Sequence, residues 1–222
     1  ELVQSIIAQY AALRSEGFSS DQIQILTPMR RVTGLGANNL NKILKDYINP
    51  VGKNHSVTKG KFDHVVTFSV NDRVMQCSNN KELGIFNGDI GKITQIEKDA
   101  ITVDFGGDIV TLLRSDLDDL ELAFASTIHK SQGSEHEAVI IPICRSHAGM
   151  MDRSLLYTGF TRGKRRVSLT GDLWMLKQIV QKVNNSKRIT GLEQCLCDEF
   201  DTSLAQNKNR NLRLQDSSYS LN

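Results

Sequence analysis

A polar segment between two short apolar runs constrains this chain more than any other feature. The polar segment is residues 126–135, and the apolar runs are residues 122–125 and 138–141. Short apolar runs bounded by polar residues are typical of buried strands. The segment between them combines hydroxyls, a basic pair, an amide, a glycine and a carboxylate. An α/β protein places a ligand site at the mouth of a parallel sheet, so the sequence predicts such a fold and such a site.

The composition fits a protein with one medium domain and a small one. The chain has 222 residues, of which 39% are hydrophobic, and a net charge of +2. Such a chain buries enough surface for a core without disulfides, and no apolar run approaches the roughly 20 residues that span a bilayer. Basic clusters occur at residues 30–31, at Lys59 with Lys61, and at residues 162–166; a solvated surface is the alternative explanation for each.

The cysteines and His129 do not predict a metal site. Cys195 and Cys197 have one residue between them, which is poor spacing for zinc, and His129 has no metal-spaced partners. We expect reduced thiols in a cytoplasmic protein, no bound metal, and a hydrogen-bonding role for His129.

The order of predicted elements alternates, then changes character, then alternates again. We expect helices at residues 2–14 and 38–47, with Gly17 ending the first, and a strand at 23–26. Short β-branched runs follow at residues 65–68, 74–77, 90–96, 101–105 and 109–112. The Gly106-Gly107 pair is a hairpin signal, and these five strands predict a small β-barrel inserted into the larger domain.

Strand and helix alternate again after Asp119. We expect strands near residues 121–126, 138–143 and 165–170, and helices near 152–161 and 172–183. Asp172 is a plausible N-cap, and Trp174 is expected in the core. The predicted parts are 1–61 and 119–200 for the larger domain, 62–118 for the barrel, and 201–222 for a disordered tail.

Residues 126–135 have the chemistry of a phosphate site. Thr127, Lys130 and Ser131 can hold phosphate oxygens, Gly133 lets a ligand approach the backbone, and the Glu135 carboxylate can accept hydrogen bonds from ribose hydroxyls. A strand end followed by the first turn of a helix would add a positive dipole end. The alternative is a polar strand-to-helix turn with capping residues.

Two arginine clusters could extend this site. Arg162 follows a predicted helix whose apolar face is Leu155, Leu156 and Phe160. Its guanidinium fork suits a transferring γ-phosphoryl group, although a surface arginine at a helix end is the simpler explanation. Arg30 follows the predicted strand at 23–26, at the ligand edge of an α/β sheet.

The order of these motifs resembles that of the RecD-like superfamily 1 DNA helicases, of the exodeoxyribonuclease V alpha-subunit and conjugative type. Residues 25–30 with 34–36 and 40–41 resemble motif IV, residues 126–135 motif V, and residues 156–162 motif VI. Residues 71–76 and 86–91 are similar to the SH3-like barrel of that family. The resemblance spans roughly residues 20–180 and implies a RecA-like motor domain 2A with the barrel as domain 2B.

The resemblance also implies residue roles. Arg162 would be the arginine finger and Arg30 a second sensor of the γ-phosphate. Gln132, Gly133 and Glu135 would face the nucleotide together with Arg162. A second group would lie on or beside the single-stranded DNA: Thr127, His129, Lys130 and Ser131. The family moves 5′ to 3′ along DNA, and the cofactor implied is ATP with Mg²⁺.

Two departures from the family pattern shape the functional expectation. Gly163 replaces the alanine that usually follows the motif VI arginine, and we expect it to loosen the helix end. The printed sequence also has no G-x-x-x-x-G-K-[ST] phosphate loop. We therefore expect ATP and Mg²⁺ to be bound mainly by a separate Walker A motor domain, and this chain alone to be inactive.

Partners and alternatives follow from the same motifs. The expected partners are single-stranded DNA, the Walker A domain, and nuclease or helicase subunits in repair or recombination, with no membrane. A non-catalytic module that binds single-stranded nucleic acid, built on a degenerate motor domain, is the alternative function. A helicase joined to a conjugative relaxase is a third.

Overall fold

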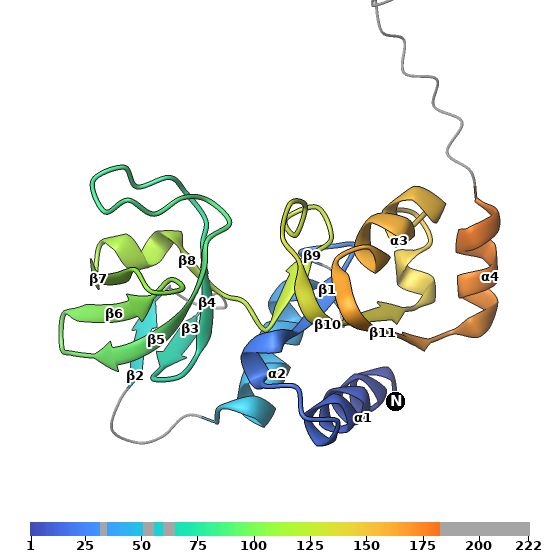
Figure 1. The fold of residues 1–222 in the computed structure, drawn as a ribbon, viewed down its shortest axis with the longest axis horizontal. Helices are drawn as coiled ribbons and strands as arrows, with labels where there is room; N and C mark the ends of the chain where they lie inside the picture. Colours follow the sequence, from blue (N-terminus) through green and yellow to red (C-terminus); the bar gives the residue numbers. More distant parts are fainter. Residues whose placement is uncertain (32–34, 51–55, 60–64, 183–222) are drawn as a thin grey trace, which may run out of the picture. The chain divides into compact units, whose positions relative to one another are not determined.

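A four-stranded parallel sheet forms the centre of the larger part of the molecule (Figure 1). The computed structural model describes residues 1–31, 35–50, 56–59 and 65–182. The parallel sheet has the strand order β11-β10-β1-β9. Its strands are β1 (Ile23–Thr27), β9 (Ala125–Thr127), β10 (His136–Ile143) and β11 (Gly163–Gly171). The α/β class predicted from the sequence is confirmed.

Helices cover both faces of this sheet (Figure 1). Side chains alternate along a strand, so Ala138 and Ile140 of β10 face one cluster while Val139 and Ile141 face the other. The first cluster includes residues of α1 (Leu2–Ser15) and α2 (Ala37–Ile48), and the second includes residues of α3 (Arg153–Phe160) and α4 (Leu173–Gln181). The result is a three-layer α/β domain, as the alternating elements predict.

A second, antiparallel sheet has the order β7-β6-β5-β4-β8. Its strands are β4 (Arg73–Gln76), β5 (Ile90–Ile96), β6 (Ala100–Asp104), β7 (Ile109–Leu113) and β8 (Leu120–Leu122). Gly106 and Gly107 join β6 to β7 with φ of 78° and 116°, which confirms the predicted hairpin. An SH3-like antiparallel sheet was expected here, but its membership differs. The predicted strand at 65–68 is β3 (Val66–Ser69), which pairs instead with β2 (Ser56–Lys59).

The single strand predicted at residues 121–126 is wrong, because the chain divides there between the two sheets. β8 pairs with β4 of the antiparallel sheet, and β9 pairs with β1 of the parallel sheet. The Asn41 side chain holds the crossing: its amide nitrogen donates to the carbonyls of Leu122 and Ala125, both at 2.8 Å. Its amide oxygen accepts from the Ala125 N–H at 2.7 Å. Every residue from Leu122 to Ser126 is buried, so apolar content alone does not reveal the change of sheet.

The antiparallel sheet enters the chain at one place in the parallel fold. β1, α2 and β9 make a strand–helix–strand unit, since β1 and β9 are adjacent and parallel and α2 lies between them in sequence. All antiparallel strands lie between α2 and β9 in sequence. The insert therefore takes the position of an ordinary helix-to-strand connection.

Buried polar contacts join the insert to the parallel domain. The Lys45 ammonium of α2 forms an ion pair with the Asp72 carboxylate, and their side chains are 5% and 0% exposed. Arg73 of β4 is also buried, and its Nη1 donates to the Ile23 carbonyl at 3.0 Å. Such groups are costly to bury unless they are paired, so these contacts specify how the insert meets α2 and β1.

Helices α3 and α4 bury fewer aromatic residues than the sequence predicts. Trp174 is 59% exposed, with the Arg145 guanidinium 5.6 Å from its ring centre, and Phe160 is 51% exposed. The core side of α4 carries Met175 and Ile179 instead, because only one stripe of so short a helix can face the sheet. The Asp172 cap is confirmed, with Oδ1 accepting from the Met175 N–H at 3.0 Å.

The domain limits predicted from the sequence stay a prediction, and the tail at 201–222 lies outside the described residues. Within the described residues, no helix has the length and apolar character needed to cross a membrane.

Candidate functional site

The polar segment that follows β9 runs from one end of the parallel sheet to the other. It leaves β9 at Thr127, at the carboxyl end, and enters β10 at His136, at the amino end. Residues 128–133 form turns, and residues 134–135 lead into β10 without a helix, so the expected helix dipole is absent from this loop. Ile128 is fully buried in the cluster beneath α3, which fixes the loop against one face of the sheet.

Arg162 and the end of this loop meet at the amino end of the strands. Arg162 directly precedes β11, and its Nη1 donates to the Ser134 carbonyl at 3.2 Å. Its Nε donates to the Thr158 carbonyl at 3.2 Å, and its Nη2 to the Thr161 hydroxyl at 3.3 Å. No carboxylate in the described part of the chain forms an ion pair with Arg162. The guanidinium is thus oriented by neutral oxygens and keeps an uncompensated charge.

The predicted nucleotide-facing residues lie on the same stretch of loop. Gln132, Gly133 and Glu135 are exposed, and Gly133 has a φ of 86°, which favours glycine. The Glu135 carboxylate forms an ion pair with Lys164 at 3.2 Å. These residues present exposed polar groups on the loop whose Ser134 carbonyl accepts from Arg162, and their contact with a nucleotide stays a prediction.

Gly163 does not loosen the end of α3, contrary to expectation. It is the first residue of β11 and lies opposite His136. A β-carbon at this position would collide with the Val167 side chain and approach the Arg166 carbonyl to 3.1 Å. The bulge between the His136 and Ala138 pairs brings these atoms close, so glycine fits the position for steric reasons.

Arg30 lies at the other end of the sheet, with Lys130. Arg30 follows β1 and forms an ion pair with Glu121 of β8, whose other carboxylate oxygen is 3.3 Å from the Lys130 ammonium. The strands separate this end from Arg162 by roughly 20 Å, at about 3.3 Å per residue. The structure therefore does not bring Arg30 and Arg162 together, and this placement does not fit the expectation that both contact one γ-phosphate.

The four predicted DNA-contacting residues differ in exposure. His129 is exposed, and Thr127 and Lys130 are half-buried. Ser131 is only 3% exposed, and its hydroxyl donates to the Ile128 carbonyl at 2.8 Å. The Ser131 hydroxyl thus stabilises the turn. Its burial does not fit the predicted contact of Ser131 with DNA.

His136 is an ionisable residue that the sequence analysis did not single out. Its backbone N–H donates to the Arg162 carbonyl at 2.8 Å, the residue is 8% exposed, and its ring Nε2 is unpaired among the described residues. Burial, and then the positive charges of Arg73, Arg162 and Lys164, lower the pKa of His136 to about 4. The imidazole is therefore neutral at pH 7, beside the arginine that the resemblance marks as catalytic.

The lowered pKa of His136 predicts a loss of stability in mild acid. The unfolded chain takes up a proton near pH 6.5, whereas the folded chain does so only near pH 4. The contribution of His136 to the free energy of unfolding is therefore complete above pH 6.5. It falls as the pH drops from 6.5 to 4, by roughly 3 kcal/mol in total. Urea unfolding at pH 7 and near pH 4.5 should show a smaller loss for His136→Gln than for the wild type. His129→Gln, which replaces an exposed histidine, is the control, and equal losses in both variants would contradict the assignment.

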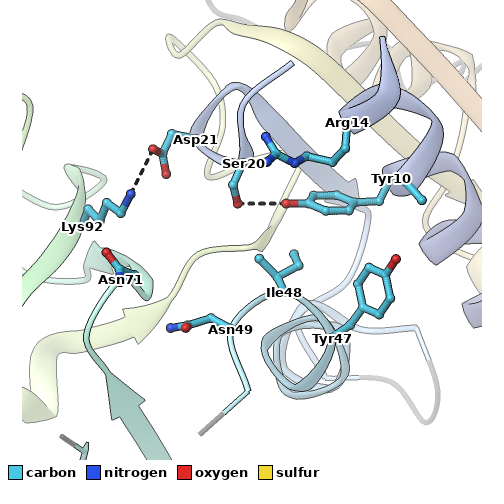
Figure 2. A pocket seen from close by; sticks show the side chains of 10 residues that line it. Tyr10, Arg14, Ser20, Asp21, Tyr47, Ile48, Asn49, Asn71 and Lys92 are labelled. Atoms are coloured by element: carbon cyan, nitrogen blue, oxygen red, sulfur yellow. Dashed lines mark hydrogen bonds and ion pairs between the residues drawn. The ribbon is translucent and has the colours of Figure 1, made fainter. Parts of the chain in front are cut away.

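A separate pocket of about 510 Å³ lies near the start of β1 (Figure 2). Tyr10 of α1 donates to or accepts from the Ser20 hydroxyl at 2.8 Å, and Lys92 of β5 forms an ion pair with Asp21 at 3.4 Å. Tyr47 of α2 completes the wall, edge-on to Tyr10 with ring centres 6.3 Å apart. None of the predicted site residues lines this pocket. Among the described residues, no group of three His, Cys, Asp or Glu is placed to hold a metal ion.

Two protein-family models match the chain. The SH3 domain of ATP-dependent RecD-like DNA helicases matches residues 40–105, and the C-terminal domain of UvrD-like helicases matches residues 122–170. The first match covers most of the antiparallel sheet, and the second contains the loop after β9, α3 and Arg162.

Similar proteins agree with these matches. The ATP-dependent RecD2 DNA helicase of Deinococcus radiodurans is 35% identical over 149 residues, which cover 67% of this chain and 20% of that protein. The RecBCD enzyme subunit RecD of Mycolicibacterium smegmatis is 31% identical over 123 residues, which cover 55% of this chain and 22% of the relative. The chain thus spans about a fifth of the length of these curated relatives.

A solved structure shares the fold. The Pif1 helicase from Bacteroides, in complex with ADP-AlF3 and ssDNA, matches with a TM-score of 0.51 and 21% identity, over 79% of this chain and 46% of that one. At this identity the likeness concerns the fold alone. From the two family matches and the RecD relatives, we conclude that the chain corresponds to the C-terminal region of RecD-like superfamily 1 helicases, with the SH3 domain and the UvrD-like domain of that region.

Proposed function

We propose that this chain is the C-terminal motor region of an ATP-dependent 5′–3′ DNA helicase. One observation carries the proposal: a single loop joins Lys130 at the carboxyl end of the parallel sheet to the Ser134 carbonyl that holds Arg162 at the amino end. In this proposal the amino end faces ATP bound on a Walker A domain, and the carboxyl end faces single-stranded DNA.

Arg162 is the residue we assign to the arginine finger. Its fork of donors is held by neutral oxygens of α3 and the loop, so its charge remains available for a γ-phosphoryl group. Preorganised charge of this kind stabilises a transferring phosphoryl group without reorganisation. Exposed backbone at Gln132 and Gly133, with the Glu135 carboxylate, would contact the nucleotide beside it.

Thr127, His129 and Lys130 are the residues we assign to single-stranded DNA. Lys130 supplies a point charge for phosphate, and the exposed His129 ring lies one residue before it. Cations at this end would make DNA binding depend on salt, because bound phosphates release counterions.

ATP and Mg²⁺ fit this chain only in part. Arg162 and the loop offer donors for phosphate oxygens, whereas the described residues offer no cluster of metal ligands and the printed sequence has no phosphate loop. We therefore propose that a Walker A motor domain holds most of the nucleotide and the ion. Association with nuclease or helicase subunits stays a prediction from the resemblance.

The test compares the chain alone with a protein in which it follows a Walker A motor domain. ATP hydrolysis with and without oligothymidylate is the measurement. We expect no turnover from the chain alone, and turnover stimulated by single-stranded DNA from the joined protein. DNA-stimulated turnover by the chain alone would overturn the division of roles. A joined protein that binds single strands but never hydrolyses ATP would favour the non-catalytic binding module.

A further inference from the structure

Glu121 lies between two cations at the carboxyl end of the parallel sheet. One carboxylate oxygen forms an ion pair with Arg30 and the other lies 3.3 Å from the Lys130 ammonium. Three different segments bring these groups together: β8 carries Glu121, Arg30 follows β1, and Lys130 follows β9. All three line one small pocket, with Thr127 and Asn38 at its wall.

The cluster is accessible and carries a net positive charge. The side chains of Arg30, Lys130 and Glu121 are 47%, 32% and 29% exposed. Burial alone would raise the pKa of Glu121, but the charges of Lys130 and Arg30 outweigh it and lower that pKa. The carboxylate is thus ionised at neutral pH and offsets one of two positive charges.

The geometry of this carboxylate resembles that of a phosphate. A carboxylate and a phosphodiester each present two anionic oxygens, and guanidinium and ammonium groups bind both. Ion pairs between partly exposed side chains contribute little to stability, so Glu121 can be displaced without unfolding the sheet. A ligand with two anionic phosphate oxygens could replace Glu121 and form ion pairs with both Arg30 and Lys130.

We propose that Arg30 and Lys130 bind one phosphate of a single-stranded nucleic acid, and that Glu121 occupies this place when no strand is bound. The inference rests on the proposed function and deepens it, since it assigns Arg30 to the strand rather than to ATP. It also gives the inserted sheet a role in binding: β8 supplies a competing anion that keeps the affinity for single strands low.

The test is the affinity of the full chain for a fluorescein-labelled oligothymidylate, measured by fluorescence anisotropy. Glu121→Gln keeps the shape but removes the competing charge, so we expect about 3- to 10-fold tighter binding. Glu137→Gln is the matched control, because Glu137 is a half-buried carboxylate 3.9 Å from Arg165 at the other end of the sheet. This control should change the affinity by less than about twofold.

Arg30 provides the second arm of the test. Arg30→Ala should weaken binding and reduce the salt slope by about one unit between about 50 and 200 mM salt. In the Arg30→Ala background, Glu121→Gln should bring a smaller gain than in the wild type, because the two residues act on one phosphate.

Cys77 reports on occupancy of the same place. Its sulfur lies 3.5 Å from the Lys130 ammonium, so a bound strand should slow alkylation of Cys77 by iodoacetamide, as followed by site-resolved mass spectrometry. An unchanged alkylation rate with saturating oligothymidylate would overturn the proposed site.

The outcomes separate this inference from the proposed function. If Lys130→Ala weakens binding while Glu121→Gln does not tighten it, or tightens it no more than Glu137→Gln, the competition fails and the DNA-binding role of the loop stands. If neither the wild type nor any variant binds the oligonucleotide, both proposals fail.

Discussion

Replacing Arg162 with alanine is expected to lower ATP hydrolysis by about 10³- to 10⁵-fold in a protein that joins this chain to a Walker A motor domain. The guanidinium is oriented by the carbonyls of Thr158 and Ser134 and has no carboxylate partner among the described residues. Its charge is therefore free to stabilise the transferring phosphoryl group. Steady-state kinetics should show the loss in kcat, since the interaction forms mainly in the transition state.

Two further substitutions make this expectation specific. Arg162→Lys should recover little activity, because a lysine is a point charge and cannot place two donors on the phosphoryl oxygens. Arg145→Ala is the matched control: Arg145 is 78% exposed, pairs with Asp172 and follows the carboxyl end of β10. Single-stranded DNA binding should stay within about twofold in all three variants. A hydrolysis rate for Arg162→Ala close to that of the wild type would contradict the finger.

Replacing Asp72 with alanine is expected to destabilise the folded chain by about 3–5 kcal/mol, because it leaves a buried charge without its partner. The Asp72 side chain is fully buried and forms an ion pair with Lys45, which is 5% exposed. Its carboxylate also accepts from the Ser69 N–H at 2.7 Å and from the Asn49 amide at 2.7 Å. Removing it would take the charge partner from Lys45, which keeps only the Ser69 hydroxyl as an acceptor, and would take an acceptor from the Ser69 N–H.

Urea unfolding of the variant measures this loss, and an exposed ion pair provides the control. Asp21→Ala removes the partner of Lys92, where the side chains are 54% and 42% exposed, and should cost at most about 1 kcal/mol. A loss for Asp72→Ala no larger than that for Asp21→Ala would show that the buried pair does not stabilise the junction of α2 with the insert.

The sequence predicted elements best where local chemistry decides the structure. Gly17 ends α1 with a φ of 95°, and the Gly106-Gly107 pair makes its hairpin, because few other residues adopt these backbone angles. Asp172 caps α4 through its own side chain. Such signals act over a few residues and need no knowledge of the rest of the fold.

Features that depend on distant contacts could not be predicted in this way. The change of sheet between β8 and β9 is fixed by Asn41, more than eighty residues earlier in the sequence. Trp174 is exposed because the sheet is reached by Met175 and Ile179, which a helical pattern alone does not decide.

The candidate site shows the same limit. The order of the motifs predicts that Arg162 and the loop belong to one site. The position of Arg30 after a strand does not reveal which end of the sheet faces the nucleotide. Glu121 had one usable signal: it alternates with Leu120 and Leu122, both buried, so its side chain lies on the opposite face of β8. Its two partners come from other strands, and no local pattern identifies them.

The position of the inserted sheet has a consequence for how this architecture can change in evolution. An insert between α2 and β9 leaves the order of the parallel strands intact, so the parent domain can gain or lose it without a change in which parallel strands pair. The Lys45 ammonium, however, has its ion-pair partner Asp72 in the insert, and loses that partner when the insert is lost. Gain or loss of the insert therefore requires compensating changes in the host: the module is separable in topology, but the Lys45 ion pair, the Arg73 contact with the Ile23 carbonyl and a shared hydrophobic cluster join it to the parent domain.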